Sequence, residues 1–170
     1  MILAPLKLHA YRVLTPQWAF QPHSGAGAAK AGGRFNRPGQ QAVYHALEPE
    51  TAIAEYGQAN PVFGPGTIAT YQLQLAQVVD FSAGYSDAWD QLWQEWDCEW
   101  KRLYFMEEVE PPTWFMSDIV ATVAVGLLFP STRRPGGTNI VIYPDRLDDA
   151  DVFNVHDPDG TLPKSRASWE

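Results

Sequence analysis

Two arginines, a tyrosine and a glutamate stand close together in residues 32–56, "GGRFNRPGQQAVYHALEPETAIAEY". Arg34 and Arg37 lie in a glycine-rich segment, and glycines let a backbone approach a ligand closely. The arginine fork matches the geometry of a phosphate group, so Arg34 is a candidate anion ligand. The alternative is a surface arginine that pairs with one of the many acidic residues of this chain.

Tyr44 and Glu55 also allow two interpretations each. Tyr44 lies in an apolar context, which is typical of a core tyrosine with a satisfied hydroxyl, but its ring is also a candidate platform for a flat ligand. Glu55 is a lone carboxylate in an otherwise apolar helical segment. Taken alone, it reads as an exposed helix glutamate, whereas beside a bound ligand it is a candidate catalytic group.

Three more polar residues are candidates for the same site. Arg12 lies in a strand-like segment beside Tyr11, and an inward orientation would require a buried partner or a bound anion. An outward orientation would make it an ordinary strand residue. Ser131 and Asn139 flank the turn "TRRPGG", and in isolation both are ordinary turn residues.

The sequence around these residues predicts the elements that position them. Alternation and β-branched residues predict strands over 7–13, 41–46, 66–81, 126–131 and 138–144. Helical spacing predicts helices over 48–59, 86–108 and 113–126, of which 86–108 has the clearest pattern, with Ser86 as its cap. Residues 15–40 are predicted as one long loop, which favours a functional or disordered segment.

The order of these elements predicts a fold class. Strands and helices are intermixed, which indicates an α+β fold in a single domain, with a mixed, mostly antiparallel sheet and flanking helices. The domain is expected to span residues 1–156, followed by a polar, loosely ordered tail over 157–170. The tryptophan stripe of residues 86–106 is typical of a core-facing helix, and a partner-binding face is the alternative.

Composition narrows the classes of function. The chain has 170 residues, 45% of them hydrophobic, and a formal net charge of −8, which argues against DNA or an anionic membrane as the main partner. The single cysteine, Cys98, excludes an intrachain disulfide, and with only four histidines no structural metal site is expected. No apolar run reaches a membrane-spanning length and no signal peptide is evident, so a cytoplasmic location is expected.

Several common catalytic motifs are missing from the sequence. It has no G-x-S-x-G elbow for serine hydrolysis, and no Gly-Lys-Ser/Thr follows the glycines of "GAGAAKAGG". Cys98 lies in the middle of an expected helix with no histidine nearby in the sequence, which does not favour a catalytic thiolate.

Four segments together resemble the RES domain family, named after its Arg, Glu and Ser positions. They are "YR" at residues 11–12, "GGRFNRPGQQAVYHA", "ETAIAEY" and "GLLFPSTRRPGGTNIVIYP". The resemblance runs from about residue 8 to residue 145, and the tryptophan-rich segment 86–106 has no counterpart in its signature. The resemblance implies a fold similar to ADP-ribosyltransferases of the diphtheria-toxin type. It also implies a toxin of a bacterial type II toxin–antitoxin pair that consumes NAD+.

The resemblance also assigns roles to the candidate residues. Arg12 and Arg34 match the arginines of the family, Glu55 its glutamate, and Ser131 the serine that follows Phe-Pro. The expected catalytic residues are Glu55, Arg34 and Tyr44. The residues expected to bind NAD+ are Arg12, Arg34, Tyr44, Ser131 and Asn139.

Cleavage of the nicotinamide–ribose bond of NAD+ requires chemical groups of the kinds that these residues carry. The bond breaks through an oxocarbenium-like centre, which a carboxylate such as Glu55 stabilises. Arginines suit the diphosphate, and the ring of Tyr44 suits the nicotinamide. Nicotinamide leaves as a neutral molecule, so one carboxylate suffices. The loop over residues 22–40 is expected to order over the ligand.

The acceptor of ADP-ribose stays open between a cellular protein, water and phosphate. A protein acceptor is favoured here, because the tryptophan-rich and acidic segment 86–110 offers a docking surface. Hydrolysis or phosphorolysis that depletes cellular NAD+ is the first alternative, and a non-catalytic module that binds a nucleotide or a partner is the second. The expected partner is an Xre-like antitoxin that occludes the site and carries any contact with DNA.

Overall fold

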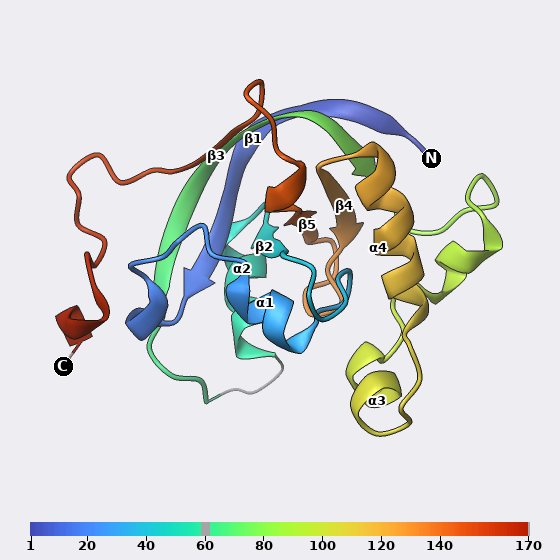
Figure 1. Cartoon of the computed structure of the whole chain (residues 1–170), viewed down its shortest axis with the longest axis horizontal. Helices are drawn as coiled ribbons and strands as arrows, with labels where there is room; N and C mark the ends of the chain where they lie inside the picture. Colours follow the sequence, from blue (N-terminus) through green and yellow to red (C-terminus); the bar gives the residue numbers. More distant parts are fainter. Residues whose placement is uncertain (59–61, 170) are drawn as a thin grey trace.

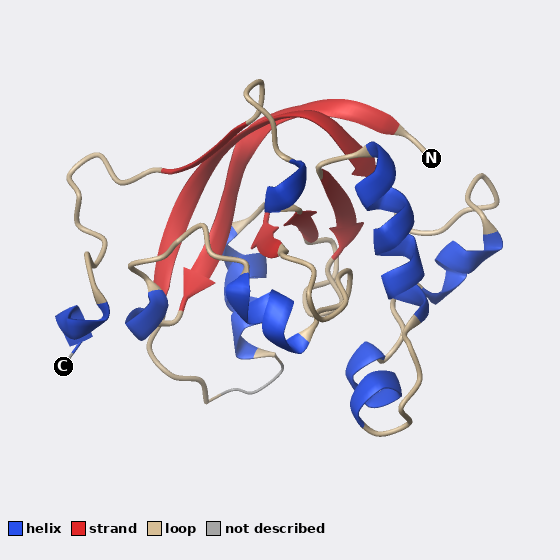
Figure 2. Ribbon diagram, in the orientation of Figure 1, coloured by secondary structure: helices blue, strands red, loops and turns tan. Residues whose placement is uncertain are grey.

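A computed structural model of the chain describes residues 1–58 and 62–169. Figures 1 and 2 show short strands beneath an arch of two long ones, with helices around them. The strands are β1 (Leu3–Leu14), β2 (Val43–Ala46), β3 (Thr67–Asp80), β4 (Gly126–Pro130), β5 (Thr138–Ile142) and β6 (Val152–Val155). The α-helices are α1 (Ala26–Ala31), α2 (Pro49–Gly57), α3 (Trp100–Phe105) and α4 (Pro112–Val123). Short 3-10 helices are η1 (Pro16–Trp18), η2 (Gln91–Glu95), η3 (Pro144–Arg146) and η4 (Arg166–Trp169).

The strands form one strongly curved sheet in the order β1-β2-β5-β4-β3-β6. β1 also pairs with β3 along most of its length, from Leu3 opposite Val79 to Leu14 opposite Thr67, and forms the arch with it (Figure 2). β1 meets β2 at a single residue pair, Tyr11 with Ala46. The pairing of β3 with β4 is parallel, whereas the other strand pairings described are antiparallel.

The buried apolar side chains lie on both faces of the sheet. One cluster gathers around Tyr71, Leu73 and Ile140 between the arch and the short strands. The other lies between the sheet and α4 and includes Met116, Val120 and Val141. At about 25 cal/mol per Å² of buried apolar surface, these two clusters supply the main drive to fold.

The predicted fold class is confirmed, and most predicted elements exist. The predicted strands 7–13, 41–46, 66–81, 126–131 and 138–144 appear as β1, β2, β3, β4 and β5, and helices 48–59 and 113–126 appear as α2 and α4. α2 begins at Pro49, whose missing N–H costs nothing in a first turn, and ends before Gln58, which is left-handed with φ 46°. Residue 59 of that prediction lies outside the described residues. β6 was not predicted, because its four residues carry too short a pattern.

The prediction of one long loop over residues 15–40 is wrong. η1 and α1 lie within it, and the Asn36 amide donates to the carbonyl oxygens of Ala28, Arg37 and Gln40 at 3.0, 3.2 and 3.1 Å. Ala28 and its neighbours have no apolar periodicity, since the helix is short and rich in alanine and glycine. The segment is therefore already ordered by its own hydrogen bonds.

The prediction of a single helix over residues 86–108 is also wrong. The segment divides into η2, a turn and α3, and the side chain of Asp90 rather than Ser86 caps η2 by accepting from the Leu92 N–H at 2.8 Å. The interpretation of the tryptophan stripe as core holds for η2, since Trp93 is 2% exposed and lies 4.8 Å from the Phe81 ring. The rings of Trp89, Trp93 and Trp96 all contact the Phe81 ring. The helical spacing of the tryptophans therefore predicts their packing on the core correctly, although no continuous helix forms.

The C-terminal residues continue the fold beyond the sheet. The Asp157 carboxylate accepts from the N–H groups of Thr161 and Leu162 at 2.7 and 3.1 Å and closes a turn. The Arg166 guanidinium then lies 5.2 Å from the ring centre of Trp18 in η1. Residue 170 of the predicted tail lies outside the described residues. Among the helices described, none combines the length and the apolar character that crossing a membrane requires.

Candidate active site

Glu55 is held by two side chains that come from distant parts of the sequence. Ser131 Oγ donates to Oε1 of Glu55 at 2.7 Å, and Asn139 Nδ2 donates to the same oxygen at 2.6 Å. Glu55 lies on α2, Ser131 directly follows β4, and Asn139 lies on β5. The two donors fix the carboxylate from one side, so Oε2 keeps its lone pairs for another donor.

The hydrogen bonds of Ser131 set the direction in which its proton points. The N–H groups of Arg133 and Arg134 donate to Ser131 Oγ at 3.1 and 3.0 Å. A hydroxyl that accepts twice has its one proton left to donate, and Glu55 is the acceptor in reach. The tight turn "TRRPGG" therefore also orients the Ser131 hydroxyl toward Glu55.

Asn139 is fixed by its place in the middle of the sheet. It pairs with Ala46 of β2 on one side and with Phe129 of β4 on the other, and it is 5% exposed. Pairing on both sides restricts its backbone, so the position of its side-chain amide is well defined. The interpretation of Ser131 and Asn139 as ordinary turn residues does not describe these contacts.

The hydroxyl of Tyr44 is used by the glycine-rich segment, whereas its ring borders open space. The hydroxyl donates to Asn36 Oδ1 at 2.8 Å and accepts from the Phe35 N–H at 2.9 Å. Burial raises the pKa of this phenol, so it stays neutral. A Cβ on Gly33 would lie 2.6 Å from the hydroxyl oxygen, so this position requires glycine. The interpretation of a satisfied hydroxyl therefore describes Tyr44, and the use of its ring as a platform for a ligand stays a prediction.

Arg34 binds the main chain of the tryptophan-rich segment. Its Nη1 donates to the carbonyl oxygens of Trp96 and Cys98 at 3.1 and 2.9 Å. Burial lowers the pKa of the guanidinium, while Cys98 and then Glu55 oppose that shift. The surface ion pair suggested as the alternative for Arg34 is absent among the described residues. In a continuous helix, the carbonyl oxygens of Trp96 and Cys98 would accept hydrogen bonds from N–H groups of the same helix. Here they accept from Arg34, which explains why the helix is interrupted after η2.

Arg12 points inward and binds neutral partners. Its Nη1 donates to the carbonyl oxygens of Pro22 and Ser24 at 3.3 and 3.4 Å. The Tyr71 hydroxyl donates to the same Pro22 carbonyl at 2.8 Å. Burial lowers the pKa of the Arg12 guanidinium, against the influence of Tyr71. No described carboxylate lies within ion-pair distance of Arg12, so its charge is available to an anion.

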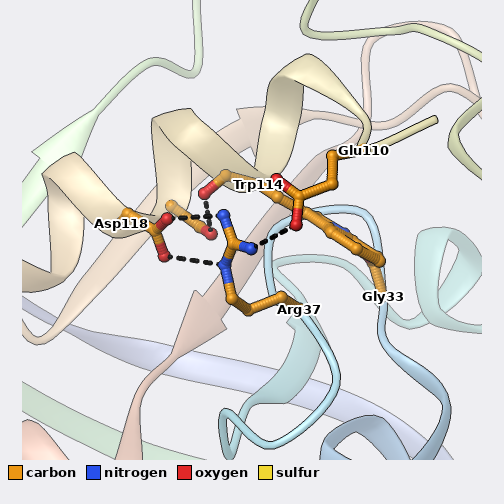
Figure 3. Close-up of polar contacts among 6 residues, drawn as sticks. Gly33, Arg37, Glu110, Trp114 and Asp118 are labelled. Atoms are coloured by element: carbon orange, nitrogen blue, oxygen red, sulfur yellow. Dashed lines mark hydrogen bonds and ion pairs between the residues drawn. The ribbon is translucent and has the colours of Figure 1, made fainter.

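Arg37 anchors the glycine-rich segment to α4, as Figure 3 shows. Its guanidinium pairs with Glu110 at 2.8 Å and with Asp118 at 2.7 Å, and it lies 5.7 Å from the ring centre of Trp114. Trp114 Nε1 in turn donates to the Gly33 carbonyl oxygen at 2.8 Å. The two arginines of the segment therefore have different surroundings. Arg37 faces α4, and Arg34 faces the candidate site.

A cavity of about 490 Å³ connects the predicted site residues. Its lining includes Arg12, Arg34, Tyr44, Glu55 and Asn139, which are five of the six predicted residues. Ser131 is absent from the lining and lies behind Glu55, where it contacts the carboxylate. Within residues 1–58 and 62–169, no group of three or more His, Cys, Asp and Glu side chains is placed to hold a metal ion.

One wall of this cavity was missed from the sequence. Trp100, Lys101 and Phe105 of α3 line it, together with Tyr56 of α2 and Gln58, which directly follows that helix. The helical spacing of the tryptophan-rich segment pointed to the core and gave no sign of this second role. A lysine beside two aromatic residues was the only available signal, and it is not specific.

Comparisons with known proteins identify the family from the sequence and a similar fold from a solved structure. Residues 9–165 match the family model described as RES domain. A solved structure described as the crystal structure of the M. tuberculosis MbcT-MbcA toxin–antitoxin complex is similar with a TM-score of 0.58 and 16% identity. That likeness covers 98% of this chain and 89% of the other, so it shows a common fold. No curated protein matches the sequence.

Proposed function

Because the chain belongs to the RES domain family, we propose that it is the toxin of a bacterial toxin–antitoxin pair and that it consumes NAD+. In this proposal the enzyme cleaves the nicotinamide–ribose bond and transfers ADP-ribose. The observation that carries the proposal is the carboxylate of Glu55, fixed by Ser131 and Asn139 at a cavity that also presents two arginines.

The proposed step uses the free oxygen of Glu55. With Oε1 occupied by two donors, Oε2 accepts from a ribose hydroxyl and places negative charge beside the anomeric carbon. The bond from that carbon to nicotinamide breaks, and its electron pair goes to the nicotinamide nitrogen, which becomes neutral. The carboxylate stabilises the positive charge left on the ribose, because a preorganised charge acts strongly in a site shielded from water.

The remaining residues hold the substrate in this proposal. The ring of Tyr44 stacks on nicotinamide, because its hydroxyl is already used and its ring borders the cavity. Arg12 and Arg34 bind the diphosphate, since their described partners are neutral carbonyl groups that leave both charges uncompensated. The substrate is NAD+, and no metal is required for any step.

A cellular protein is the proposed acceptor of ADP-ribose. Phe105 lines the cavity while 58% exposed, and Met106 beside it is 79% exposed, so an apolar surface borders the opening. Such a surface favours contact with another protein. The second candidate is transfer to water or phosphate, which depletes NAD+. The observation in its favour is that α3 lines one side of the cavity, since an additional wall favours small acceptors over large ones.

An antitoxin that fills the cavity is the proposed partner. The similar structure is a toxin–antitoxin complex by its own description, and uncontrolled NAD+ consumption would harm the producing cell. A net charge of −8 favours an Xre-like partner that carries the contact with DNA, and no membrane partner is proposed. The proposed place of action is the cytoplasm.

The proposal is tested by expressing the chain with and without the antitoxin encoded beside it. We expect growth arrest with the toxin alone, rescue by co-expression, and a purified complex that no longer releases nicotinamide from NAD+. Mass spectrometry of cell protein then separates the two acceptors: added ADP-ribose indicates a protein acceptor, and free ADP-ribose or its phosphate indicates a small one. Normal growth with folded wild-type protein and no antitoxin would contradict the toxin assignment.

A further inference from the structure

The tryptophan-rich segment supplies one positively charged residue of the cavity lining, Lys101. It lies on α3, is exposed, and lines the cavity beside Trp100 and Phe105. Its Nζ donates to Gln58 Oε1 at 2.6 Å and lies 5.7 Å from the ring centre of Trp100. No carboxylate among the described residues lies within ion-pair distance of this ammonium.

The partner of Lys101 directly follows the helix that carries the candidate carboxylate. Gln58 directly follows α2 and stands one helical turn beyond Glu55. Both Gln58 and Glu55 line the cavity, so the ammonium lies over the end of the helix that carries the carboxylate. A neutral amide does not neutralise an ammonium, and one hydrogen bond leaves two of its three N–H donors unused.

The tryptophan-rich segment also contacts Arg34, another residue of the cavity lining. The carbonyl oxygens of Trp96 and Cys98 hold Arg34, and α3 begins shortly after them. Arg12 and Arg34 each donate hydrogen bonds to two main-chain carbonyl oxygens, which uses part of their donor groups. A flexible, exposed lysine on a neutral partner can move toward an anion more readily than these two half-buried arginines can.

From these contacts we propose that Lys101 is a substrate-binding residue that leaves Gln58 and binds a phosphate of the dinucleotide. The inference rests on the proposed function, because it takes the substrate class from it. It adds that α3 closes one side of the cavity and provides a phosphate contact. The step is a change of hydrogen-bond partner, and no covalent bond forms or breaks.

The test measures the affinity of the full-length protein for ADP-ribose and for adenosine by isothermal titration calorimetry. Lys101→Gln is expected to weaken ADP-ribose binding about tenfold, because one charge-assisted hydrogen bond to a phosphate is lost. Adenosine, which has no phosphate, is expected to bind as before. Lys101→Arg is expected to keep most of the affinity. The matched control is Lys30→Gln, since Lys30 is an exposed lysine of α1 that does not line the cavity.

A second variant separates a phosphate contact from a mere bridge between α3 and α2. Gln58→Asn shortens the side chain so that it cannot reach Lys101, while asparagine tolerates the left-handed backbone at this position. We expect unchanged or slightly tighter ADP-ribose binding by Gln58→Asn. Equal weakening by Gln58→Asn and Lys101→Gln would overturn the proposal, because the bridge would then be the important contact.

The outcomes also separate this proposal from the proposed function. If the wild type binds ADP-ribose and Lys101→Gln binds it equally well, the role of Lys101 is refuted and the proposed function stands. If the wild type binds neither ADP-ribose nor NAD+, the proposed function fails and the role of Lys101 fails with it.

Discussion

Asn139 Nδ2 lies 2.6 Å from Oε1 of Glu55, although 84 residues separate the two in the sequence. This contact joins the middle strand β5 to the helix α2 and sets the direction of a carboxylate at the cavity. The strand register that places Asn139 opposite Phe129 and Ala46 is therefore part of the candidate site.

The donors of Glu55 are expected to affect the rate of the reaction more than substrate binding. Asn139→Ala and Ser131→Ala should each lower kcat for nicotinamide release by about tenfold to a hundredfold, because a small misplacement of a catalytic group has effects of this order. The KM for NAD+ should change less. Thr138→Ala on the same strand is the control, since the Thr138 side chain does not line the cavity. Unchanged kcat in both variants would show that Glu55 needs no positioning.

The fork of Arg34 is expected to be essential for substrate binding even when charge is kept. Arg34→Lys should weaken NAD+ binding by about tenfold or more, because lysine cannot bind a diphosphate in the bidentate manner of arginine. The dissociation constant is best measured in the Glu55→Gln background, which prevents turnover. Arg37→Lys is the matched control, because Arg37 binds Glu110 and Asp118 outside the cavity. Equal dissociation constants for Arg34→Lys and its parent would remove Arg34 from the site.

Buried His45 is expected to make the fold sensitive to acid. Neither of its ring nitrogens has a hydrogen-bond partner among the described residues, and burial, followed by the charges of Arg12 and His23, holds its pKa well below the ordinary value. Above pH about 6.5 the imidazole is neutral in both folded and unfolded chains. Below that pH the unfolded chain gains a proton that the folded chain does not accept, so the free energy of unfolding falls as pH falls.

The variant His45→Leu tests this link between burial and pH. It keeps a similar volume and loses no hydrogen bond, so the stability above pH about 6.5 should change little. The loss of stability at lower pH should become smaller, although part should remain because the pKa of His23 is also lowered by burial. Urea unfolding on both sides of that pH measures the effect. An identical pH dependence in wild type and variant would assign the acid sensitivity to other groups.

Much of the fold was predictable because its elements carry local signals. β3 alternates between more exposed and buried side chains from Ile68 to Ala76, and α2 has a proline at its start, so both were found at nearly the right bounds. The break in the tryptophan-rich segment was not predictable, because it depends on the Arg34 guanidinium, more than 60 positions earlier. Apolar spacing reports which side chains are buried and does not report which carbonyls a distant arginine will bind.

In the candidate site, too, local sequence patterns identify single residues but not the contacts between distant ones. Glu55, Ser131 and Asn139 each look ordinary in their own segment, and the resemblance to a family was needed to group them. Their convergence on one oxygen follows from the sheet order, which no local pattern encodes. The wall formed by Trp100, Lys101 and Phe105 was missed because its spacing fits a core helix equally well.

If the charge of Glu55 drives cleavage of NAD+, its loss must slow nicotinamide release, which is measured for purified wild type and Glu55→Gln. The substitution keeps the size of the side chain and removes its charge. Glu50→Gln on the same helix is the control, because Glu50 is exposed and does not line the cavity. We predict release by wild type and by Glu50→Gln, and a loss of about a hundredfold or more in Glu55→Gln with an unchanged fold. Equal release by wild type and Glu55→Gln would show that this charge does not drive cleavage, and no release by folded wild type would show that the protein does not cleave NAD+.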